Sequence, residues 1–289
     1  MHCQPGILEE MTPSVARHVF FAIDNPEQVA AGLARLAAIV DTHATIVGVG
    51  TSTLQALQHN NEKLHAFPAL SHQGIDIPST QHALWCWLRG DDRGELLHRT
   101  RTIEQALAPG FKRVHTTEAF RYLDGHDLTG YEDGTENATG EEAAAIVNDT
   151  QAPYGTYASV QHWIHDLDVM KSLPQTEQDN IIGRRLSDNE ELESAPESAH
   201  VKRTAMEDFE PAANVIRRSM PFIDGDDNGL VFLAFADSLV PFEMQLRRMI
   251  GLDDDIVDAL FRFSRATTGG HYWCPPAVEG KLDLSALLA

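Results

Sequence analysis

The chain has 289 residues, of which 43% are hydrophobic, and a formal charge of −21, because 43 acidic residues outnumber 22 basic ones. The acidic excess argues against duplex nucleic acid and against an anionic membrane surface as partners, since both attract basic protein faces. The apolar fraction is enough for a sizeable core and excludes an intrinsically disordered chain. At roughly 100–200 residues per domain, the length predicts one large domain or two smaller ones.

The cysteines and the first ten residues indicate in which cellular compartment the protein is expected. Cys3, Cys86 and Cys274 are odd in number and scattered, so they form neither a disulfide framework nor a zinc-ligand spacing. Residues 1–10 show no charged-then-apolar export signal, and no apolar run reaches about 18 residues. We therefore expect a cytoplasmic protein that does not span a membrane.

The first half of the chain alternates between strand and helix patterns. Residues 17–23 are β-branched and aromatic and end at a turn signal, residues 24–26. Val29, Leu33 and Leu36 follow with helical spacing. The predicted elements are strand 17–23, helix 27–40, strand 45–50, a helix from residue 51 or 52, strand 84–88, helix 94–108 and strand 111–122. This order is typical of a ferredoxin-like βαββαβ unit.

The second half repeats this order less clearly. Its predicted elements are strand 157–164, helices 166–173 and 177–182, strands 215–220 and 230–235, and helices 242–250 and 254–263. We therefore predict an α+β protein of two ferredoxin-like halves, residues 1–145 and 146–289. Two polar connections, 60–80 and 184–200, are long, and long loops inside compact domains are more often functional than accidental.

Two formal motif matches are better explained as ordinary structure. Gly48-Val49-Gly50 lacks the third glycine of a dinucleotide-binding loop and is interpreted as a tight turn. His162 and His165 lie three positions apart on a predicted strand, so their side chains point to opposite faces. These two histidines are not expected to share a metal ion.

Two polar segments contain residues suited to catalysis. In residues 128–137, glycines flank the acidic residue Asp133, in a turn where the backbone can approach a ligand closely. A solvated surface turn is the alternative interpretation. His200 stands where the connection 184–200 gives way to an expected extended run. Its imidazole is a candidate ligand, although a lone histidine is more often an ordinary polar residue.

A third segment places charge on an apolar strand. Alternation along strand 215–220 puts Arg217 and Ser219 on one face and Arg218 on the other. A charge on the inward face must be paired or must serve an anionic ligand. Together the three segments supply a histidine, an arginine, a carboxylate and a hydroxyl. A haem peroxidase needs such groups, because iron requires an axial nitrogen and peroxide cleavage requires a base and a cation.

The sequence resembles the dye-decolorizing peroxidases, most closely their cytosolic bacterial branch (type B), over nearly the whole chain. The matching segments are residues 4–8, the GxxDG stretch 130–135, and residues 182–184, 198–201, 217–221 and 261–270. GxxDG alone is a common pattern, but the ordered set, with His200 seventeen positions before Arg217, is specific. Ala138 replaces a proline that is usual in the family, a departure that concerns the local loop conformation rather than the chemistry.

The resemblance implies a haem b cofactor and a role for each matching residue. His200 would be the proximal axial ligand of the iron, and Asp133 the distal acid–base residue. Arg217 would be the distal arginine, in contact with the cofactor, and Ser219 would take a distal position held by serine or asparagine. Further implied roles are cofactor binding at Gly134, neutralisation of a haem propionate by Arg203, and a proximal carboxylate, Asp258, that accepts the other ring N–H of His200.

The implied fold is two ferredoxin-like halves in the dimeric α+β barrel arrangement shared with chlorite dismutases. The implied activity is reduction of hydrogen peroxide and oxidation of dyes, phenolics or other one-electron donors through an oxo-ferryl intermediate. Its partners would be peroxide and a small-molecule reductant, with no nucleic acid and no membrane, in a homo-oligomer. Bulky donors would require surface aromatic residues that relay electrons, and the candidates are Trp85, Trp87, Trp163, Tyr272 and Trp273.

Two functions of other classes stay open at this level. A haem or porphyrin carrier of the same fold would bind the cofactor with little turnover, and peroxide-dependent oxidation of a phenol distinguishes it. A cofactor-free ferredoxin-like interaction module would show no haem-dependent absorbance.

Overall fold

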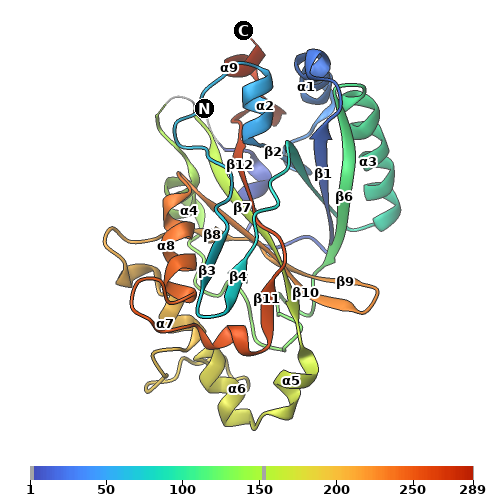
Figure 1. The fold of residues 1–289 in the computed structure, drawn as a ribbon. Helices are drawn as coiled ribbons and strands as arrows, with labels where there is room; N and C mark the ends of the chain where they lie inside the picture. The colour runs from blue at the N-terminus through green and yellow to red at the C-terminus, as the bar shows by residue number, and fades with distance from the viewer. Residues whose placement is uncertain (1–2, 152–153, 289) are drawn as a thin grey trace.

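Four strands and two helices of the first half form a βαββαβ unit in the computed structural model, which describes residues 3–151 and 154–288. The antiparallel strands lie in the order β2-β5-β1-β6. Helices α1 and α3 cover one face of this sheet (Figure 1), where Leu33 and Leu36 are buried against Val19 and Phe21. The elements are β1 (Val15–Ile23), α1 (Val29–Ile39), β2 (Thr45–Val49), β5 (Leu84–Gly90), α3 (Arg93–Leu107) and β6 (Phe111–Phe120).

The second half repeats this connectivity. Its main strands lie in the order β12-β7-β10-β9, which is the ferredoxin-like order of the first half. Two short strands, β8 and β11, extend the edges of β10 and β7. The elements are β7 (Thr156–His165), α5 (Leu167–Ser172), α6 (Gln175–Ile182), β8 (Ile216–Arg217), β9 (Met220–Asp224), β10 (Asp227–Ala236), α8 (Val240–Met249), β11 (Ser264–Ala266) and β12 (Gly270–Cys274).

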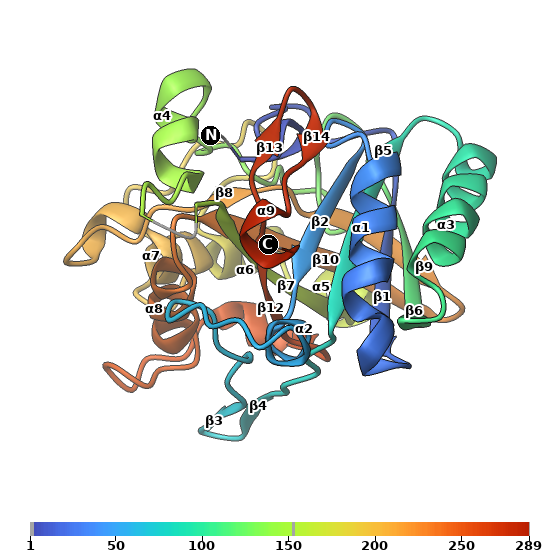
Figure 2. The same cartoon turned by 90° about the horizontal axis from the view of Figure 1, so that it is seen from above.

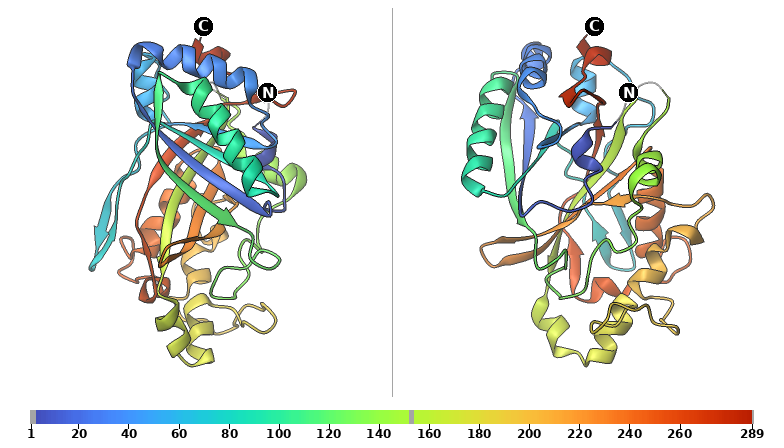
Figure 3. Two further views of the ribbon diagram at one scale, coloured as in Figure 1. Left: turned by 90° about the vertical axis from the view of Figure 1, so that its right-hand side faces the viewer. Right: turned by 180° about the vertical axis from the view of Figure 1, so that it is seen from behind.

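The two sheets join into one. β2 pairs with β12 where Val49 meets Trp273, and β6 pairs with β9 where Ala119 meets Phe222. Because β7 also pairs with β10, the pairings of this ten-stranded sheet return to their start (Figures 1 and 3). The α+β fold with ferredoxin-like connectivity is therefore confirmed.

Side-chain alternation gives strand β5 a buried cluster on each face. On β5, Leu84, Cys86 and Leu88 face helices α1 and α3, whereas Trp85 and Trp87 face the interior enclosed by the two sheets. The apolar run 84–88 thus reads as a strand that is buried on both faces. Figure 2 shows α1 and α3 together on one side of the molecule, next to β1 and β6.

Several predicted elements differ from the structure. The helix expected at 254–263 is wrong, because the chain turns after α8 with a positive φ at Gly251 and Asp255 and forms only the 3-10 turn η4 (Ala259–Arg262). The extended run expected after His200 is also wrong, since His200 opens helix α7 (His200–Thr204). Strand 215–220 is interrupted between β8 and β9.

The remaining elements are short and connect the main ones. The division at residue 145 stays a prediction, and that residue lies inside α4, which contacts β8 and β10. The short elements are η1 (Pro5–Ile7), η2 (Pro26–Gln28), α2 (Thr51–Ala56), β3 (Leu70–His72), β4 (Ile75–Ile77), α4 (Gly140–Val147), η3 (Met206–Asp208), β13 (Ala277–Val278), β14 (Lys281–Leu282) and α9 (Ser285–Leu288).

Two whole-chain features accompany this fold. Within residues 3–151 and 154–288, the helices are all too short or too polar to cross a membrane. Cys3, Cys86 and Cys274 are free and buried, all three at no more than 1% exposure.

Candidate active site

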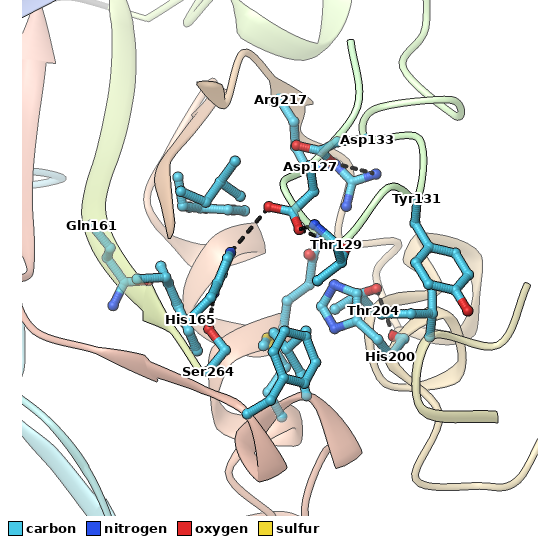
Figure 4. Close-up of a pocket in the computed structure, with 18 of the residues that line it drawn as sticks. Asp127, Thr129, Tyr131, Asp133, Gln161, His165, His200, Thr204, Arg217 and Ser264 are labelled. Carbon is cyan, nitrogen blue, oxygen red and sulfur yellow. Dashed lines mark hydrogen bonds and ion pairs between the residues drawn. The ribbon is translucent and has the colours of Figure 1, made fainter. Parts of the chain in front are cut away.

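A cavity containing about 860 Å³ of empty space lies between β7, β10, α8 and the segments that carry Asp133 and His200 (Figure 4). Its walls are largely apolar and aromatic, and six of these side chains are Trp163, Phe232, Phe242, Leu246, Met249 and Phe263. A second, more polar cavity adjoins it, and Asp133, His200, Thr204 and Arg217 line both.

The loop around Asp133 is held in place by its own backbone and by Asn137. Gly134 has a φ of +73°, a conformation that favours glycine, and the Asp133 amide donates to Gly125 at 3.0 Å. Asn137 Nδ2 donates to the Arg217 carbonyl at 3.0 Å, and its Oδ1 accepts from the Arg217 amide at 2.7 Å. This double hydrogen bond joins the loop to strand β8 and brings two predicted site residues together.

Asp133 and Arg217 face each other across a gap. Arg217 Nη2 lies 3.9 Å from Asp133 Oδ1, and both side chains are about one-quarter exposed, at 24% and 23%. Figure 4 shows the pair at one end of the cavity. The separation exceeds a direct hydrogen bond, so both groups keep donors and acceptors available for a ligand.

Arg218 and Ser219, which follow Arg217, do not line the main cavity. Arg218 Nε donates to the Ile7 carbonyl at 3.1 Å on the opposite face, and burial lowers the pKa of this guanidinium to about 10. Ser219 does not line the large cavity. Its hydroxyl accepts from the Leu233 amide at 3.3 Å, and the residue borders a small cavity that Asp133 also lines. The predicted alternation therefore describes Arg217 and Arg218 correctly, whereas Ser219 is one step removed from the main cavity.

His200 projects into the cavity from the first turn of α7 (Figure 4). Its Nδ1 lies 2.8 Å from Asp258 Oδ2, and the Asp258 side chain is fully buried. The other oxygen of Asp258 accepts from the Leu260 amide at 2.8 Å, which fixes the carboxylate in the turn before η4. With Nδ1 donating to this carboxylate, the lone pair on Nε2 is available to a ligand in the cavity.

Arg203 lies outside both cavities. Its guanidinium makes a bidentate pair with Asp254, at 2.6 and 2.8 Å, and donates to the Arg248 carbonyl at 2.7 Å. The propionate contact expected for Arg203 therefore has no support in this arrangement. The arginine that lines the more polar cavity besides Arg217 is Arg184, which is already ion-paired with Glu136.

A buried polar chain in the cavity wall was missed by the sequence analysis. His165 Nε2 lies 3.0 Å from Asp127 Oδ2, and His165 Nδ1 lies 2.7 Å from Ser264 Oγ (Figure 4). Burial alone would raise the pKa of Asp127, but hydrogen bonds from His165 and Thr129 outweigh it and leave the pKa low. The signal was alternation on β7, which turns Gln161, Trp163 and His165 into the cavity and His162 to the other face.

The aromatic residues expected as surface relays are not on the surface. Trp85, Trp87, Tyr272 and Trp273 are at most 1% exposed, and Trp163 is 4% exposed. Trp163 alone among them lines the main cavity, with its Nε1 donating to Gln161 at 3.3 Å.

These features fit a haem. The cavity offers one imidazole nitrogen, apolar walls for a flat ring, and a carboxylate with a guanidinium placed apart from the imidazole. A histidine nitrogen is a common axial ligand of haem iron, and a carboxylate bound to the other ring nitrogen raises the basicity of the imidazole.

Comparisons with known proteins agree with this description. The family model for the C-terminal part of Dyp-type peroxidases matches residues 124–279, which is more than half of the chain. A dye-decolorizing peroxidase from Rhodococcus erythropolis is 28% identical over 81% of this chain and 72% of its own length. A dye-decolorizing peroxidase from Mycobacterium tuberculosis is 29% identical over 74% of this chain and 67% of its own length.

Solved structures resemble the whole fold. A dye-decolorizing protein from Vibrio cholerae superposes with a TM-score of 0.84 and 27% identity, over 93% of this chain and 96% of that chain. A DypB variant from Rhodococcus jostii in complex with heme superposes with a TM-score of 0.80 and 25% identity, over 93% and 95% of the two chains.

Proposed function

The chain belongs to the Dyp-type, or dye-decolorizing, peroxidase family and is a haem-dependent peroxidase with haem b as its cofactor, and we propose which of its residues carry the reaction. This membership sets aside the cofactor-free module and the haem carrier. The proposal depends on one observation: the His200–Asp258 hydrogen bond leaves Nε2 facing a cavity that Asp133 and Arg217 also line.

We propose that His200 Nε2 holds the haem iron and that Asp258 orients the ring. The Asp258 carboxylate accepts a hydrogen bond from the Nδ1–H of His200 at 2.8 Å. This bond fixes the tautomer in which Nε2 is unprotonated, and it increases electron donation from the imidazole. The apolar walls exclude water from the porphyrin faces. When bound, haem supplies the iron at which the peroxide O–O bond is cleaved and the electrons for that cleavage.

Asp133 and Arg217 act on the peroxide in this proposal. The Asp133 carboxylate takes a proton from one peroxide oxygen and returns it to the leaving oxygen, directly or through a water molecule. The Arg217 guanidinium stabilises the negative charge that develops on the oxygens. Their separation of 3.9 Å supports these roles, because a close ion pair would occupy the groups with each other. Ser219, behind Asp133, is proposed as a positioning residue through the small cavity they share.

The partners are hydrogen peroxide and a reducing substrate. We propose a small-molecule phenol or dye as the reductant, oxidised one electron at a time, and we propose Trp163 as the aromatic contact through which it donates electrons. A cytoplasmic location and a homo-oligomeric state are further proposals, supported by the resemblance to the type B branch. A solved relative from Mycobacterium smegmatis, at TM-score 0.83 and 25% identity, is described as an encapsulated DyP-type peroxidase.

Replacing His200 with alanine tests the proposal. Haem-reconstituted wild type should show a Soret band, which should be lost or strongly shifted in His200→Ala because the axial nitrogen is gone. Absorbance at matched protein concentration is the measurement, together with oxidation of a phenol after peroxide is added.

The matched control is His98→Ala, which removes an exposed imidazole on α3. It should retain the wild-type spectrum and turnover. A stoichiometric and unchanged Soret spectrum in His200→Ala would exclude His200 as the axial ligand.

A further inference from the structure

Three side chains from distant parts of the chain converge outside the haem cavity. His65 lies in the segment between α2 and β3, Glu243 in the first turn of α8, and His271 on β12. His65 Nε2 is 2.6 Å from Glu243 Oε1, His271 Nδ1 is 3.8 Å from the same oxygen, and all three ligand atoms lie within 4.8 Å of one another. Figures 1 and 2 show the segment between α2 and β3 passing close to β12 and α8.

His271 provides independent evidence for a ligand. Its side chain is fully buried, and neither ring nitrogen has a hydrogen-bond partner among the described residues. Buried polar atoms are nearly always satisfied, so an imidazole left without partners points to a missing group. The His65–Glu243 hydrogen bond explains those two residues but leaves His271 unexplained.

The surroundings hold His271 in a defined orientation. Its backbone is bound on both sides by Gln81, which accepts from the amide at 2.8 Å and donates to the carbonyl at 2.7 Å. Phe67 and Phe242 lie against its ring, at centroid distances of 4.7 and 6.0 Å. An apolar shell of this kind limits solvent access around a metal site.

The donor set and its spacing suit a transition metal ion. Two imidazoles and one carboxylate bind zinc and similar divalent ions, at about 2.0–2.2 Å per bond, and leave a fourth position open. Tetrahedral ligands at such bond lengths lie roughly 3.3 Å apart, which falls between the 2.6 and 3.8 Å separations from Glu243 Oε1. The fourth position would face solvent, because the His65 side chain is half exposed.

We propose that His65, Glu243 and His271 form a second metal site, separate from the haem, that binds one divalent transition-metal ion of the zinc class. The ion joins the segment between α2 and β3 to α8 and β12. Phe242, the neighbour of Glu243 on α8, lines the haem cavity, so the ion also anchors one wall of that cavity.

Zinc titration of the haem-loaded protein tests the site. The wild type should bind one tight equivalent of Zn²⁺ per chain by calorimetry, counted separately from the haem iron. His65→Ala and Glu243→Gln should each weaken this binding by at least about tenfold, because each removes a ligand. His72→Ala is the matched control, since His72 pairs with Asp255 at 3.3 Å on the surface and belongs to no three-ligand group among the described residues. This variant should bind zinc like the wild type.

A second measurement separates a specific site from weak binding to surface histidines. Zn²⁺ should slow amide hydrogen exchange in residues 58–69 of the wild type and not in Glu243→Gln. An unchanged Soret band in each variant shows that the haem site is intact, so a negative result bears on the metal site alone. The absence of a tight equivalent in the wild type, or equal affinity in His65→Ala, would overturn the proposal.

Discussion

Asn137 links the two residues that face the distal side of the proposed haem site. Its amide bonds both the N–H and the C=O of Arg217, while the loop that carries it also carries Asp133. The relative position of carboxylate and guanidinium is thus set by hydrogen bonds between the Asn137 side chain and the Arg217 backbone, rather than by their own 3.9 Å contact. This placement should persist when either the Asp133 or the Arg217 side chain is replaced. The rates of such variants therefore measure the chemical role of the missing group rather than a change in the loop.

Replacing Asp133 and replacing Arg217 should slow the reaction with peroxide to different extents. Arg217→Ala should slow formation of the peroxide-oxidised enzyme by about 10²–10³-fold, the usual loss for one group that stabilises developing charge. Asp133→Asn should slow it less, because water and Arg217 can still move the proton. Stopped-flow absorbance after mixing with peroxide measures both rates.

The exposed arginine Arg185, which pairs with Asp188, provides the control. Arg185→Ala removes the same charge away from both cavities and should leave the rate unchanged. If Arg217→Ala and Asp133→Asn both react at the wild-type rate, the distal assignment is wrong.

The proximal hydrogen bond should tune the haem iron. Asp258→Asn keeps the shape of the side chain but weakens the acceptor for His200 Nδ1, so the imidazole donates less electron density to the iron. The reduction potential of the ferric haem should rise, as measured by spectroelectrochemistry. Asp254→Asn is the comparison, because that carboxylate pairs with Arg203 and not with His200. Equal reduction potentials in the wild type and in Asp258→Asn would show that Asp258 does not tune the haem iron.

At the scale of elements, periodicity predicted the long strands and helices and failed where tertiary contacts decide. The strands β1, β5 and β7 have continuous apolar or alternating runs, which local patterns describe well. The residues after α8 have helical spacing, but a positive φ at Asp255 and the Asp258 side chain, which accepts from the Leu260 amide, produce a turn instead. That turn is what directs Asp258 at His200.

The site residues, like the elements, could be predicted where a local sequence pattern marks them and not where tertiary contacts decide. Asp133, His200 and Arg217 could be predicted because each stands in a recognisable segment, and the structure places all three around one cavity. The partner of Arg203 could not be predicted, because Asp254 reaches it only through the turn that replaced an expected helix. The Asp127–His165–Ser264 chain likewise depends on the pairing of β7 with β11, which no local pattern contains.

For the molecule as a whole, buried histidines make stability depend on pH. Burial lowers the pKa of His162 to about 4, with His115 and His82 contributing, and burial next to His65 lowers the pKa of His271 to about 3. His18 is shifted in the same direction by burial and by His162. In the unfolded chain these imidazoles take up protons near pH 6.5, so the folded state loses stability as the pH falls below 6.5.

The unfolding midpoint in urea should therefore fall between pH 7 and pH 4.5. Each histidine that stays neutral in the folded state contributes a slope of up to about 1.4 kcal/mol per pH unit below pH 6.5. His162→Gln should show a shallower dependence than the wild type, and His98→Ala, at the surface, should show the same dependence. Identical slopes in wild type and His162→Gln would contradict the assignment.

The three buried cysteines affect how the protein withstands its own substrate. Hydrogen peroxide oxidises the thiolate form of cysteine. Burial raises the pKa of Cys3 to about 11 and raises those of Cys86 and Cys274 further, so their sulfurs stay protonated as well as shielded. An enzyme that uses a strong oxidant thereby keeps its cysteine side chains in an unreactive form. Cysteine oxidation should therefore not limit how long the enzyme stays active in peroxide.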